Sequence, residues 1–494
     1  MTTLDTSIEA RQAAQEHERP DLARATFVVA GLVLVAQLAF ATRYGWHRDE
    51  LYFVAAGRHL AWGYVDQPPF TPAVARAATA LFGTSLLGLR LVPALANAVV
   101  VVLAAVIARE LGGNRRAQLL AATAVAVSSV ILATGHLLST TTFDLLAWTA
   151  LTAVFARLLR TGDTRWWLAV GVIAGMGMEN KYTVAFLVGA FVVGVLLCRR
   201  DLLRGRWLWV GAGVAVLLWA PNLVWQAQHS WPAVDMSRAL HAKGVDDANT
   251  FTFLPLQLIY LGPVVTPLWI AGLLWTVRTD AGRPYRPVAV AWVALTVFFM
   301  ATAGKAYYIA GLYPFLLAAG SVWLVARWRP ASVRRYLAVV VVAGVLATPL
   351  ALPILPITDV GSGAVAAVNP EFRESYAWPQ FVDTVDRVPG ATVFTLNYGE
   401  AGALQRFAPG NRPVYSGHNN YWLWGPPPDG LEPVVVVGHF SDDYLAAHFR
   451  DCRPEATIDN PDHVPNQERG AGVWSCAGPL RPWHTEWPSL RHYS

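Results

Sequence analysis

Nine long runs of apolar residues divide this 494-residue chain, and they constrain its fold more than any other feature. Each run is nearly free of charge and approaches the ~20 residues, or at least ~17, that a transmembrane helix needs. A soluble core has no use for nine such runs, and only 14% of the residues are charged, whereas soluble chains carry about 25%. The sequence therefore predicts a multi-pass membrane protein with helices over 25–41, 88–108, 118–134, 183–198, 207–225, 255–277, 288–303, 306–326 and 336–354.

Arginine residues between the apolar runs predict the orientation of the chain. Basic residues concentrate in the cytoplasmic loops of membrane proteins, and a cytoplasmic N-terminus puts every arginine-rich loop on that side. The pattern needs two further spans, over 138–157 and 166–180, which makes about eleven in all. An odd number of spans places the C-terminus outside. The arginine-rich loops are 109–116, 157–165, 199–206, 278–287 and 327–335.

The composition changes near Pro356, after which charged residues are no longer confined to short loops. We expect a cytoplasmic tail over 1–24 and a transmembrane domain over 25–355. Residues 356–494 are expected to form a small, soluble extracytoplasmic α/β domain, because strands and helices alternate in it. The strands are predicted over 391–398, 433–438 and 472–476, and the helices over 379–388, 399–408 and 442–450.

The cysteines agree with an exported C-terminal domain. Cys452 and Cys476 both lie in it and are expected to pair in an oxidising compartment, whereas Cys198 is expected to be a small buried residue. The aromatic loop 415–424 has three interpretations: it stacks on a sugar, lies at the membrane interface or packs against the transmembrane domain. We favour packing against the transmembrane domain over stacking on a sugar.

Residues 42–87 form the longest outer loop of the membrane region. Two stretches in it, 50–61 and 70–82, are too short to span and are expected to be helices at the membrane interface. Asp49 and Glu50 stand at the start of the first helix. Acids favour helix N-termini, so one interpretation is that the pair only caps this helix; the other is that it carries chemistry.

More charged residues gather in the outer half of the predicted bundle. Asp144 falls several residues inside a span, where an ionisable side chain costs about 2.5–3.5 kcal/mol at mid-bilayer and marks a functional site by default. Only three of the 38 lysine and arginine residues are lysines, and Lys181, Lys243 and Lys305 all map to the outer face. The whole layer of charges comprises Asp49, Glu50, Asp66, Asp144, Glu179, Lys181 and Lys305.

Acidic and basic side chains near an outer membrane surface suit a reaction that transfers a group from a membrane-anchored phosphate donor to a hydroxyl acceptor. A carboxylate accepts the hydroxyl proton as a general base, and a cation stabilises the charge that develops on the leaving phosphate. A transporter or flippase of lipid-linked saccharides uses similar charges, although the sequence has neither an internal repeat nor paired broken spans. A non-catalytic membrane scaffold is a further alternative.

Several short motifs, taken in order and with their spacing, carry a resemblance to a known family. They run from Asp49-Glu50 to Tyr313-Pro314, and over most of residues 30–325 the chain resembles the bacterial family 39-like glycosyltransferases of the GT-C fold. These enzymes are relatives of protein O-mannosyltransferases and of aminoarabinose transferases that act on lipid A. The motifs between these ends are Tyr52, Tyr64 through Pro69, Gly88 through Pro93, Asp144, Asn180-Lys181-Tyr182 and Lys305-Ala306-Tyr307-Tyr308.

The resemblance implies functions for individual residues. Asp49 matches the acid taken as catalytic in the family's first outer loop, and Glu50 lies beside it. Lys305 and Tyr308 match a segment placed near the lipid phosphate.

The chain departs from the family pattern at two expected cations. Gln67 replaces the lysine of the family's Glu-Lys-Pro-Pro segment, in which Asp66 stands for the glutamate, and Tyr52 replaces an arginine. Phosphate binding is therefore expected to rest on Arg58, Lys181 and Lys305.

We predict a glycosyltransferase of the cell membrane that moves a sugar from a polyprenyl-phosphate carrier to a hydroxyl of an envelope glycan, lipid or protein. Asp49 is the expected general base, and Glu50, Asp66 or Asp144 are expected to shape the pocket. Inversion of the anomeric configuration is expected because the sequence offers no obvious nucleophile.

No cofactor is expected, with a divalent metal left open. Nucleic acid is excluded because the basic residues lie between spans and not on one face.

Single introduced cysteines test the orientation. In intact cells, a cysteine at Asp163, Leu203 or Ala281 should resist an impermeant thiol reagent, because arginine-rich loops are expected in the cytoplasm. A cysteine at Gly430 should be labelled, and all four should be labelled after permeabilisation. Labelling at Leu203 together with protection at Gly430 would invert the topology.

Overall fold

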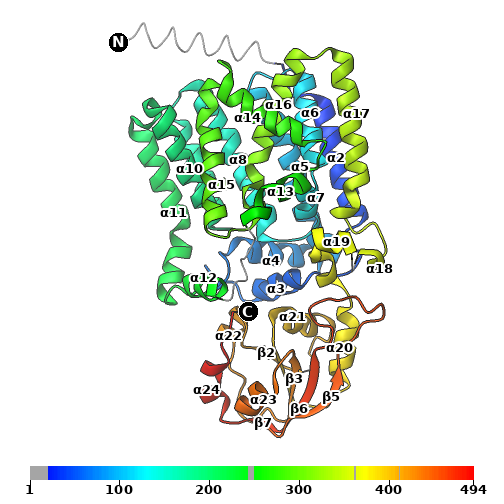
Figure 1. Cartoon of the computed structure of the whole chain (residues 1–494). Coiled ribbons are helices and arrows are strands. Elements are labelled where there is room, and N and C mark those ends of the chain that lie inside the picture. The colour runs from blue at the N-terminus through cyan, green and yellow to red at the C-terminus, as the bar shows by residue number, and fades with distance from the viewer. Residues whose placement is uncertain (1–19, 243–249, 361–362, 411, 494) are drawn as a thin grey trace.

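The computed structural model describes residues 20–242, 250–360, 363–410 and 412–493. They form a helical bundle with a layer containing a β-sheet at one end (Figure 1). Lys243, which the sequence assigns to the outer face, lies outside the described residues.

The bundle is that of a multi-pass membrane protein. Among the described residues, six helical segments are long and apolar enough to cross a membrane, or up to eight segments if each of two bent helix pairs counts as one span. The six are Leu86–Glu110 (α5), Thr140–Thr161 (α8), Arg206–Gln228 (α11), Arg283–Ala301 (η2 and α15), Ala306–Arg327 (η3 and α16) and Pro330–Leu350 (α17 and η4).

Two of the predicted spans are broken. α6 (Arg115–Ala126) and α7 (Ser129–His136) meet at 61°, and α13 (Thr250–Leu261) and α14 (Thr266–Arg278) meet at 111°. The second break follows Gly262-Pro263, where proline cannot continue the hydrogen-bond ladder of a helix. Shorter apolar helices are α2 (Arg24–Ala39), α9 (Trp166–Met178) and α10 (Thr183–Cys198).

Glycine pairs allow the closest helix crossings in the bundle. A Cβ atom at Gly272 of α14 would come within 1.9 Å of the Leu316 carbonyl oxygen, and one at Gly171 of α9 within 2.1 Å of the Gly211 carbonyl oxygen. Small residues at a crossing let two backbones approach each other, which is how helices associate where lipid removes the hydrophobic driving force.

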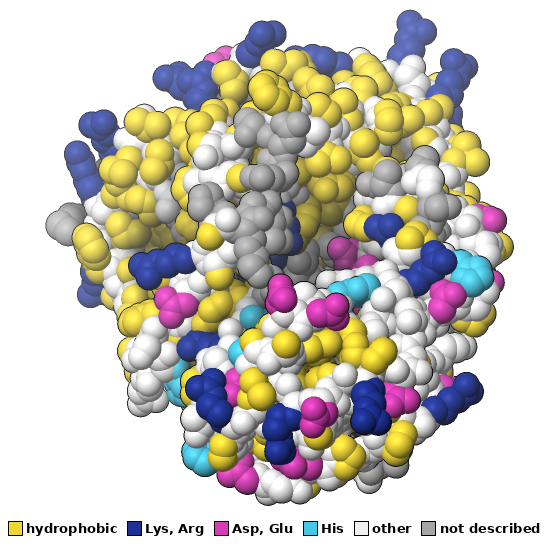
Figure 2. Space-filling view, turned by 60° about the horizontal axis from the view of Figure 1, so that its bottom comes forward, with side chains coloured by type: hydrophobic (Ala, Val, Ile, Leu, Met, Phe, Trp, Pro, Cys, Tyr) yellow, Lys and Arg dark blue, Asp and Glu magenta, His cyan; other side chains and the backbone are white. Residues whose placement is uncertain are grey.

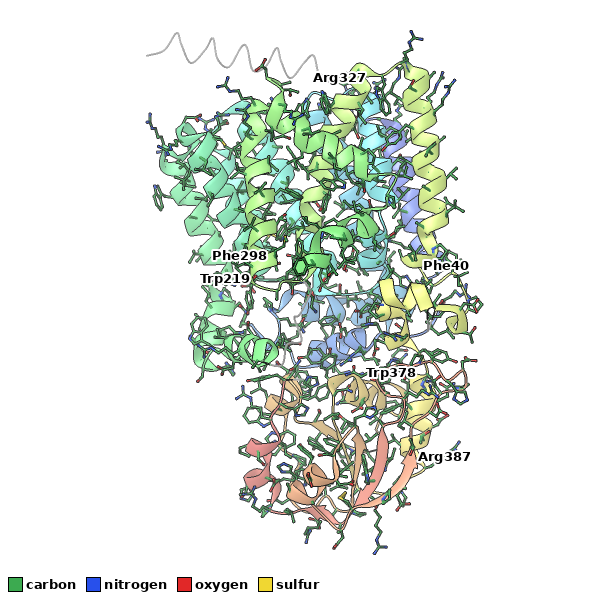
Figure 3. The ribbon with its side chains drawn as sticks, in the orientation of Figure 1. Phe40, Trp219, Phe298, Arg327, Trp378 and Arg387 are labelled. Atoms are coloured by element: carbon green, nitrogen blue, oxygen red, sulfur yellow. A yellow bond between two sulfur atoms is a disulfide. The ribbon has the colours of Figure 1, made fainter. Side chains whose placement is uncertain are left out.

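Charged residues are confined to the two ends of the bundle. Apolar side chains cover its sides, and Lys and Arg gather at the rim farthest from the sheet layer (Figure 2). Arg327 lies at that end, whereas Phe40, Trp219 and Phe298 lie at one level near the opposite end (Figure 3). Aromatic residues are frequent where a bundle meets the membrane surface.

Two short helices lie across the bundle end that faces the sheet layer (Figure 1). α3 (Arg48–Arg58) and α4 (Phe70–Phe82) correspond to the stretches 50–61 and 70–82, so the two helices are confirmed, and their place at the membrane interface stays a prediction. The remaining helices outside the sheet layer are η1 (Arg200–Leu203), α12 (Pro232–Ala242), α18 (Ile357–Val360), α19 (Gly363–Val368) and η5 (Pro370–Ser375).

The sheet layer is built on a five-stranded mixed sheet of order β2-β1-β3-β6-β5. β1 (Thr392–Thr395) pairs in parallel with β2 (Val414–Ser416) and β3 (Val434–Gly438), and β6 (Gly472–Cys476) pairs antiparallel with β3 and β5 (Arg453–Thr457). The three predicted strands are thus present as β1, β3 and β6. The short strands are β4 (Phe449–Arg450) and β7 (Gly478–Pro479).

Helices flank this sheet, and the three predicted ones are present as α20, α21 and α23. A run of valines makes β3 buried on both faces, as expected of a central strand. The helices of the layer are α20 (Trp378–Asp386), α21 (Tyr398–Phe407), α22 (Asn420–Trp424), α23 (Asp442–His448), α24 (Trp483–Glu486) and η6 (Trp487–Leu490).

The cysteines give one confirmed and one wrong expectation. Cys452 and Cys476 form a disulfide, with their Cα atoms 4.0 Å apart. Cys198 is exposed, not buried. It ends α10 beside Leu197, which is itself 66% exposed, so Cys198 lies on the side of the last turn that faces away from the bundle.

Candidate active site

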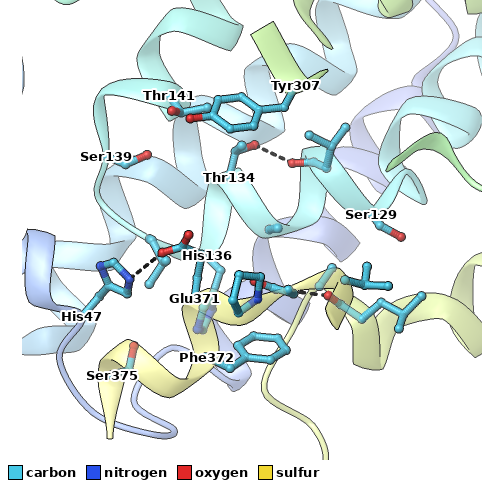
Figure 4. Close-up of a pocket in the computed structure, with 18 of the residues that line it drawn as sticks. His47, Ser129, Thr134, His136, Ser139, Thr141, Tyr307, Glu371, Phe372 and Ser375 are labelled. Atoms are coloured by element: carbon cyan, nitrogen blue, oxygen red, sulfur yellow. Dashed lines mark hydrogen bonds and ion pairs between the residues drawn. The ribbon is translucent and has the colours of Figure 1, made fainter. Parts of the chain in front are cut away.

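A cavity of about 370 Å³ opens at the end of the bundle that faces the sheet layer. Its apolar wall comes from α7, α13 and η4, through residues such as Val130, Ile259 and Leu350. Its polar side chains come from α7 and the start of α8, from the segment around the start of α3, and from η3 and η5 (Figure 4). The charged and titratable members are Arg43, Tyr44, His47, Asp49, His136, Tyr260, Lys305, Tyr307 and Glu371.

Asp49 and Lys305 line this same cavity, which confirms the expectation that they share one. Asp49 lies in the first turn of α3, and its Oδ1 accepts a hydrogen bond of 2.8 Å from the Tyr398 hydroxyl. Lys305 immediately precedes η3 and is exposed. A carboxylate and an ammonium group therefore face one space, although 256 residues separate them in the sequence.

The cap of α3 is made by His47 and Glu50, not by Asp49. The His47 Nδ1 accepts a hydrogen bond of 3.2 Å from the Asp49 amide, and the His47 amide donates to Glu50 Oε2 at 2.9 Å. This reciprocal pair is a capping box. The capping interpretation is thus correct for Glu50 and wrong for Asp49, whose carboxylate is left for other contacts.

His47 also contacts Glu371 of η5 across the cavity wall. Its Nε2 lies 3.0 Å from Glu371 Oε2 (Figure 4). Because Nδ1 already accepts a hydrogen bond, Nε2 must carry the proton and donate it, which fixes the tautomer. Burial lowers the pKa of His47, but the bond to Glu371 and the neighbouring carboxylates raise it overall. The bond from His47 in turn holds the pKa of Glu371 below its usual range.

Glu50 is fully buried and does not line the cavity. Its Oε1 accepts from Arg90 Nε at 2.9 Å and from the Leu138 amide at 3.1 Å, and its Oε2 accepts from Arg90 Nη2 at 2.7 Å. Arg90 of α5 also donates to the carbonyl oxygens of Ala41 and Gly45 at 2.6 and 2.9 Å. Glu50 therefore organises the loop before α3 and the first turn that carries Asp49, and its own carboxylate does not line the cavity.

Lys181 and Asp144 lie beside the cavity without lining it. The Lys181 Nζ donates to the Thr141 hydroxyl at 3.1 Å and stands 5.0 Å from the ring centre of Tyr308. Asp144 is buried and accepts from the Thr183 hydroxyl at 2.7 Å. Thr141 does line the cavity, so Lys181 is one residue removed from it.

Asp66 and Arg58 are farther from the cavity. Asp66 accepts from the Tyr52 hydroxyl at 2.9 Å and from the Asn419 amide group at 3.4 Å, and burial raises its pKa to about 7. Arg58 is exposed at the far end of α3. The expectation that Asp66 or Asp144 would line the cavity is therefore wrong, because both carboxylates turn to hydroxyl partners elsewhere.

The loop 415–424 packs against the first outer loop, as the favoured interpretation holds. The Asn420 side chain accepts from the Val65 amide at 2.6 Å, and Asn419 reaches Asp66.

Sequence reasoning missed His47, Glu371 and Tyr398. His47 could have been predicted, because it stands in the Trp-His-Arg-Asp-Glu motif. The sequence around Glu371 and Tyr398 contains no motif that points to a functional site. Over the described parts of the chain, no three His, Cys, Asp or Glu side chains are arranged to hold a metal ion.

Comparison with known proteins gives relatives of one kind. The family described as dolichyl-phosphate-mannose-protein mannosyltransferase matches residues 66–225. Lipid A galacturonosyltransferase RgtD of Rhizobium johnstonii is 28% identical over 275 residues, 52% of this chain and 56% of that protein. The undecaprenyl phosphate-alpha-4-amino-4-deoxy-L-arabinose arabinosyl transferase 1 of Pseudomonas fluorescens is 27% identical over 301 residues, 57% of this chain and 54% of that protein. The chain thus spans about half the length of the curated relatives it matches.

One solved structure decides the fold. ArnT from Cupriavidus metallidurans bound to undecaprenyl phosphate superposes with a TM-score of 0.60 at 16% identity, covering 91% of this chain and 97% of that one. The chain has the fold of ArnT. So high a coverage means that the ArnT fold extends beyond the bundle into the sheet layer. These matches confirm the resemblance to family 39-like GT-C glycosyltransferases that the motifs indicate.

Replacing Glu50 tests its structural position. Glu50→Gln leaves the buried Arg90 without a counter-charge, and breaking a buried ion pair in this way costs about 3–5 kcal/mol. The thermal midpoint of the purified protein in nanodiscs should therefore fall clearly. Adding Arg90→Met should recover part of the loss, because no unpaired charge then remains. A Glu50→Gln protein as stable as the original would contradict this assignment.

Proposed function

We propose that this chain is a membrane glycosyltransferase that moves a sugar from a polyprenyl-phosphate-linked donor to a hydroxyl of the cell envelope, on a glycan, a lipid or a protein. The observation that carries the proposal is one cavity lined by both Asp49 and Lys305. One relative is a lipid A galacturonosyltransferase, the other is an arabinosyl transferase of an undecaprenyl phosphate sugar, and the ArnT structure holds undecaprenyl phosphate.

The two walls of the cavity suit an amphipathic donor. The apolar side, with Val130, Ile259 and Leu350, fits the first isoprene units of a lipid chain. Arg43 and Lys305 on the polar side supply positive charge for a phosphate, and Lys181 lies just behind Thr141. Arg58 is too far along α3 to take part, so phosphate binding rests on Lys305 and Arg43, with support from Lys181. Tyr308 holds Lys181 through its ring face.

Direct displacement at the anomeric carbon is the reaction that these groups support. Asp49 takes the proton of the acceptor hydroxyl, and the hydroxyl oxygen forms a bond to the anomeric carbon. The bond from that carbon to the phosphate oxygen breaks with its electron pair, and the polyprenyl phosphate leaves. Negative charge thus grows on the phosphate oxygen, where Lys305 stabilises it most strongly in the transition state. One displacement inverts the anomeric configuration.

The number of spans and the positions of the arginines give the orientation of the chain in the membrane. Counting each bent helix pair as one span and adding α2, α9 and α10 gives the eleven spans expected from the sequence. The arginine-rich end then lies in the cytoplasm, and the cavity opens on the outer side. We assign 1–24 to a cytoplasmic tail, 25–355 to the transmembrane domain and 356–494 to an extracytoplasmic domain. No cofactor is assigned to the reaction.

Asp49→Asn tests the general base. Asparagine keeps the size of the side chain and accepts no proton, so sugar transfer should fall by about 10²- to 10⁴-fold, the usual contribution of a general base. The measurement is the rate at which plasmid-borne variants restore the envelope species that a deletion strain lacks. The exposed Asp383→Asn serves as the control and should restore it at the normal rate. Full restoration by Asp49→Asn, at equal protein level, would rule out this base.

A further inference from the structure

Tyr398 links the sheet layer to the Asp49 carboxylate. Its hydroxyl donates to Asp49 Oδ1 at 2.8 Å, across 349 residues of sequence. A hydrogen bond to an ionised carboxylate is stronger than one between neutral groups. The contact therefore ties α21 of the sheet layer directly to the proposed base of the bundle.

Three neighbours hold the Tyr398 ring in this position. The ring stacks on Tyr52 with centroids 4.7 Å apart and on His418 at 4.8 Å, and the Arg48 guanidinium lies 4.9 Å from its centre. Flanking contacts on both ring faces leave the hydroxyl little freedom to turn away. Tyr398 also begins α21, whose N-cap Asn397 forms a capping box with Glu400, so its backbone is fixed as well.

Two glycines bring α21 close enough for the contact. A Cβ atom at Gly402 would come 2.9 Å from the Leu51 Cβ, and one at Gly399 would come 3.0 Å from the Arg48 Cβ. Contacts this short allow only glycine without a shift of the helices. The approach of α21 to α3 is therefore built into the sequence, and it sets the distance from Tyr398 to Asp49.

We propose that Tyr398 is a positioning residue for the reaction, through which the sheet layer completes the active site. It holds Oδ1 of Asp49 by a hydrogen bond, so that Oδ2 presents its lone pairs to the cavity and takes the proton of the acceptor. This role rests on the proposed function of Asp49 as the base. The sheet layer is then a required part of the catalytic centre and not only a cover over it.

Removing only the Tyr398 hydroxyl leaves the other charged groups around Asp49 in place. They are His47, Arg48, Asp66, Lys305 and Glu371.

Tyr398→Phe tests the proposal, with Tyr421→Phe as its matched control. Phenylalanine keeps the stacked ring and removes only the hydroxyl. Tyr421 is a buried tyrosine of the same layer whose hydroxyl bonds to Gln405 at 3.0 Å. Two quantities are measured: the restoration rate in the deletion strain, and the affinity of each purified protein for undecaprenyl phosphate.

The Tyr398→Phe rate should fall about tenfold, as expected for losing one hydrogen bond to a charged group. Undecaprenyl phosphate should bind as before, because the contact positions Asp49 and does not touch the lipid. Tyr421→Phe should change neither quantity. An unchanged rate in Tyr398→Phe would overturn the proposal, as would equal losses of rate in both variants with weaker lipid binding. If Asp49→Asn itself restores fully, the base assignment fails, and the role of Tyr398 fails with it.

Discussion

The candidate site depends on a buried ion pair that takes no part in the chemistry. Arg90, at the start of α5, binds both oxygens of Glu50 and two carbonyl oxygens of the loop that precedes α3. A buried charge must be fully paired to be tolerated, so the loop has one arrangement that satisfies all of these groups. That arrangement starts α3 at Arg48 and turns the next side chain, Asp49, into the cavity.

The η5 segment and the sheet layer, which both follow the bundle in the sequence, add groups that the bundle lacks. Glu371 of η5 fixes the His47 ring that caps α3, and Tyr398 of α21 binds the Asp49 carboxylate. Each comes from more than 300 residues away in the sequence, with separations of 324 and 349 residues. The cavity is therefore a composite of two regions, with an apolar wall from the bundle and a polar wall that both regions build.

A feature can be predicted from the sequence when the residues that determine it lie close together in the chain. Periodicity and length are local, and they predict α3, α4, β3 and most bundle helices. The Asp-Glu motif and the scarce lysines point to Asp49 and Lys305. The direction in which a side chain points depends on distant residues. Glu50 is an acid in the same motif as Asp49, yet its side chain faces Arg90 and not the cavity. An apolar run also does not show where its helix breaks. Residues 118–134 and 255–277 are single apolar runs, but the structure bends these segments by 61° and 111°. Tyr260, which lines the cavity, lies just before the second break.

The central claim is that the cavity shared by Asp49 and Lys305 receives the phosphate of the donor lipid. A structure of the protein in nanodiscs, determined by electron cryomicroscopy with undecaprenyl phosphate added, tests it most directly. We expect phosphate density in this cavity within about 4 Å of the Lys305 Nζ, the distance of an ion pair, with the lipid chain along Val130 and Ile259. Phosphate bound beside Arg58, or anywhere from which Asp49 cannot reach the anomeric carbon of an attached sugar, would contradict the account.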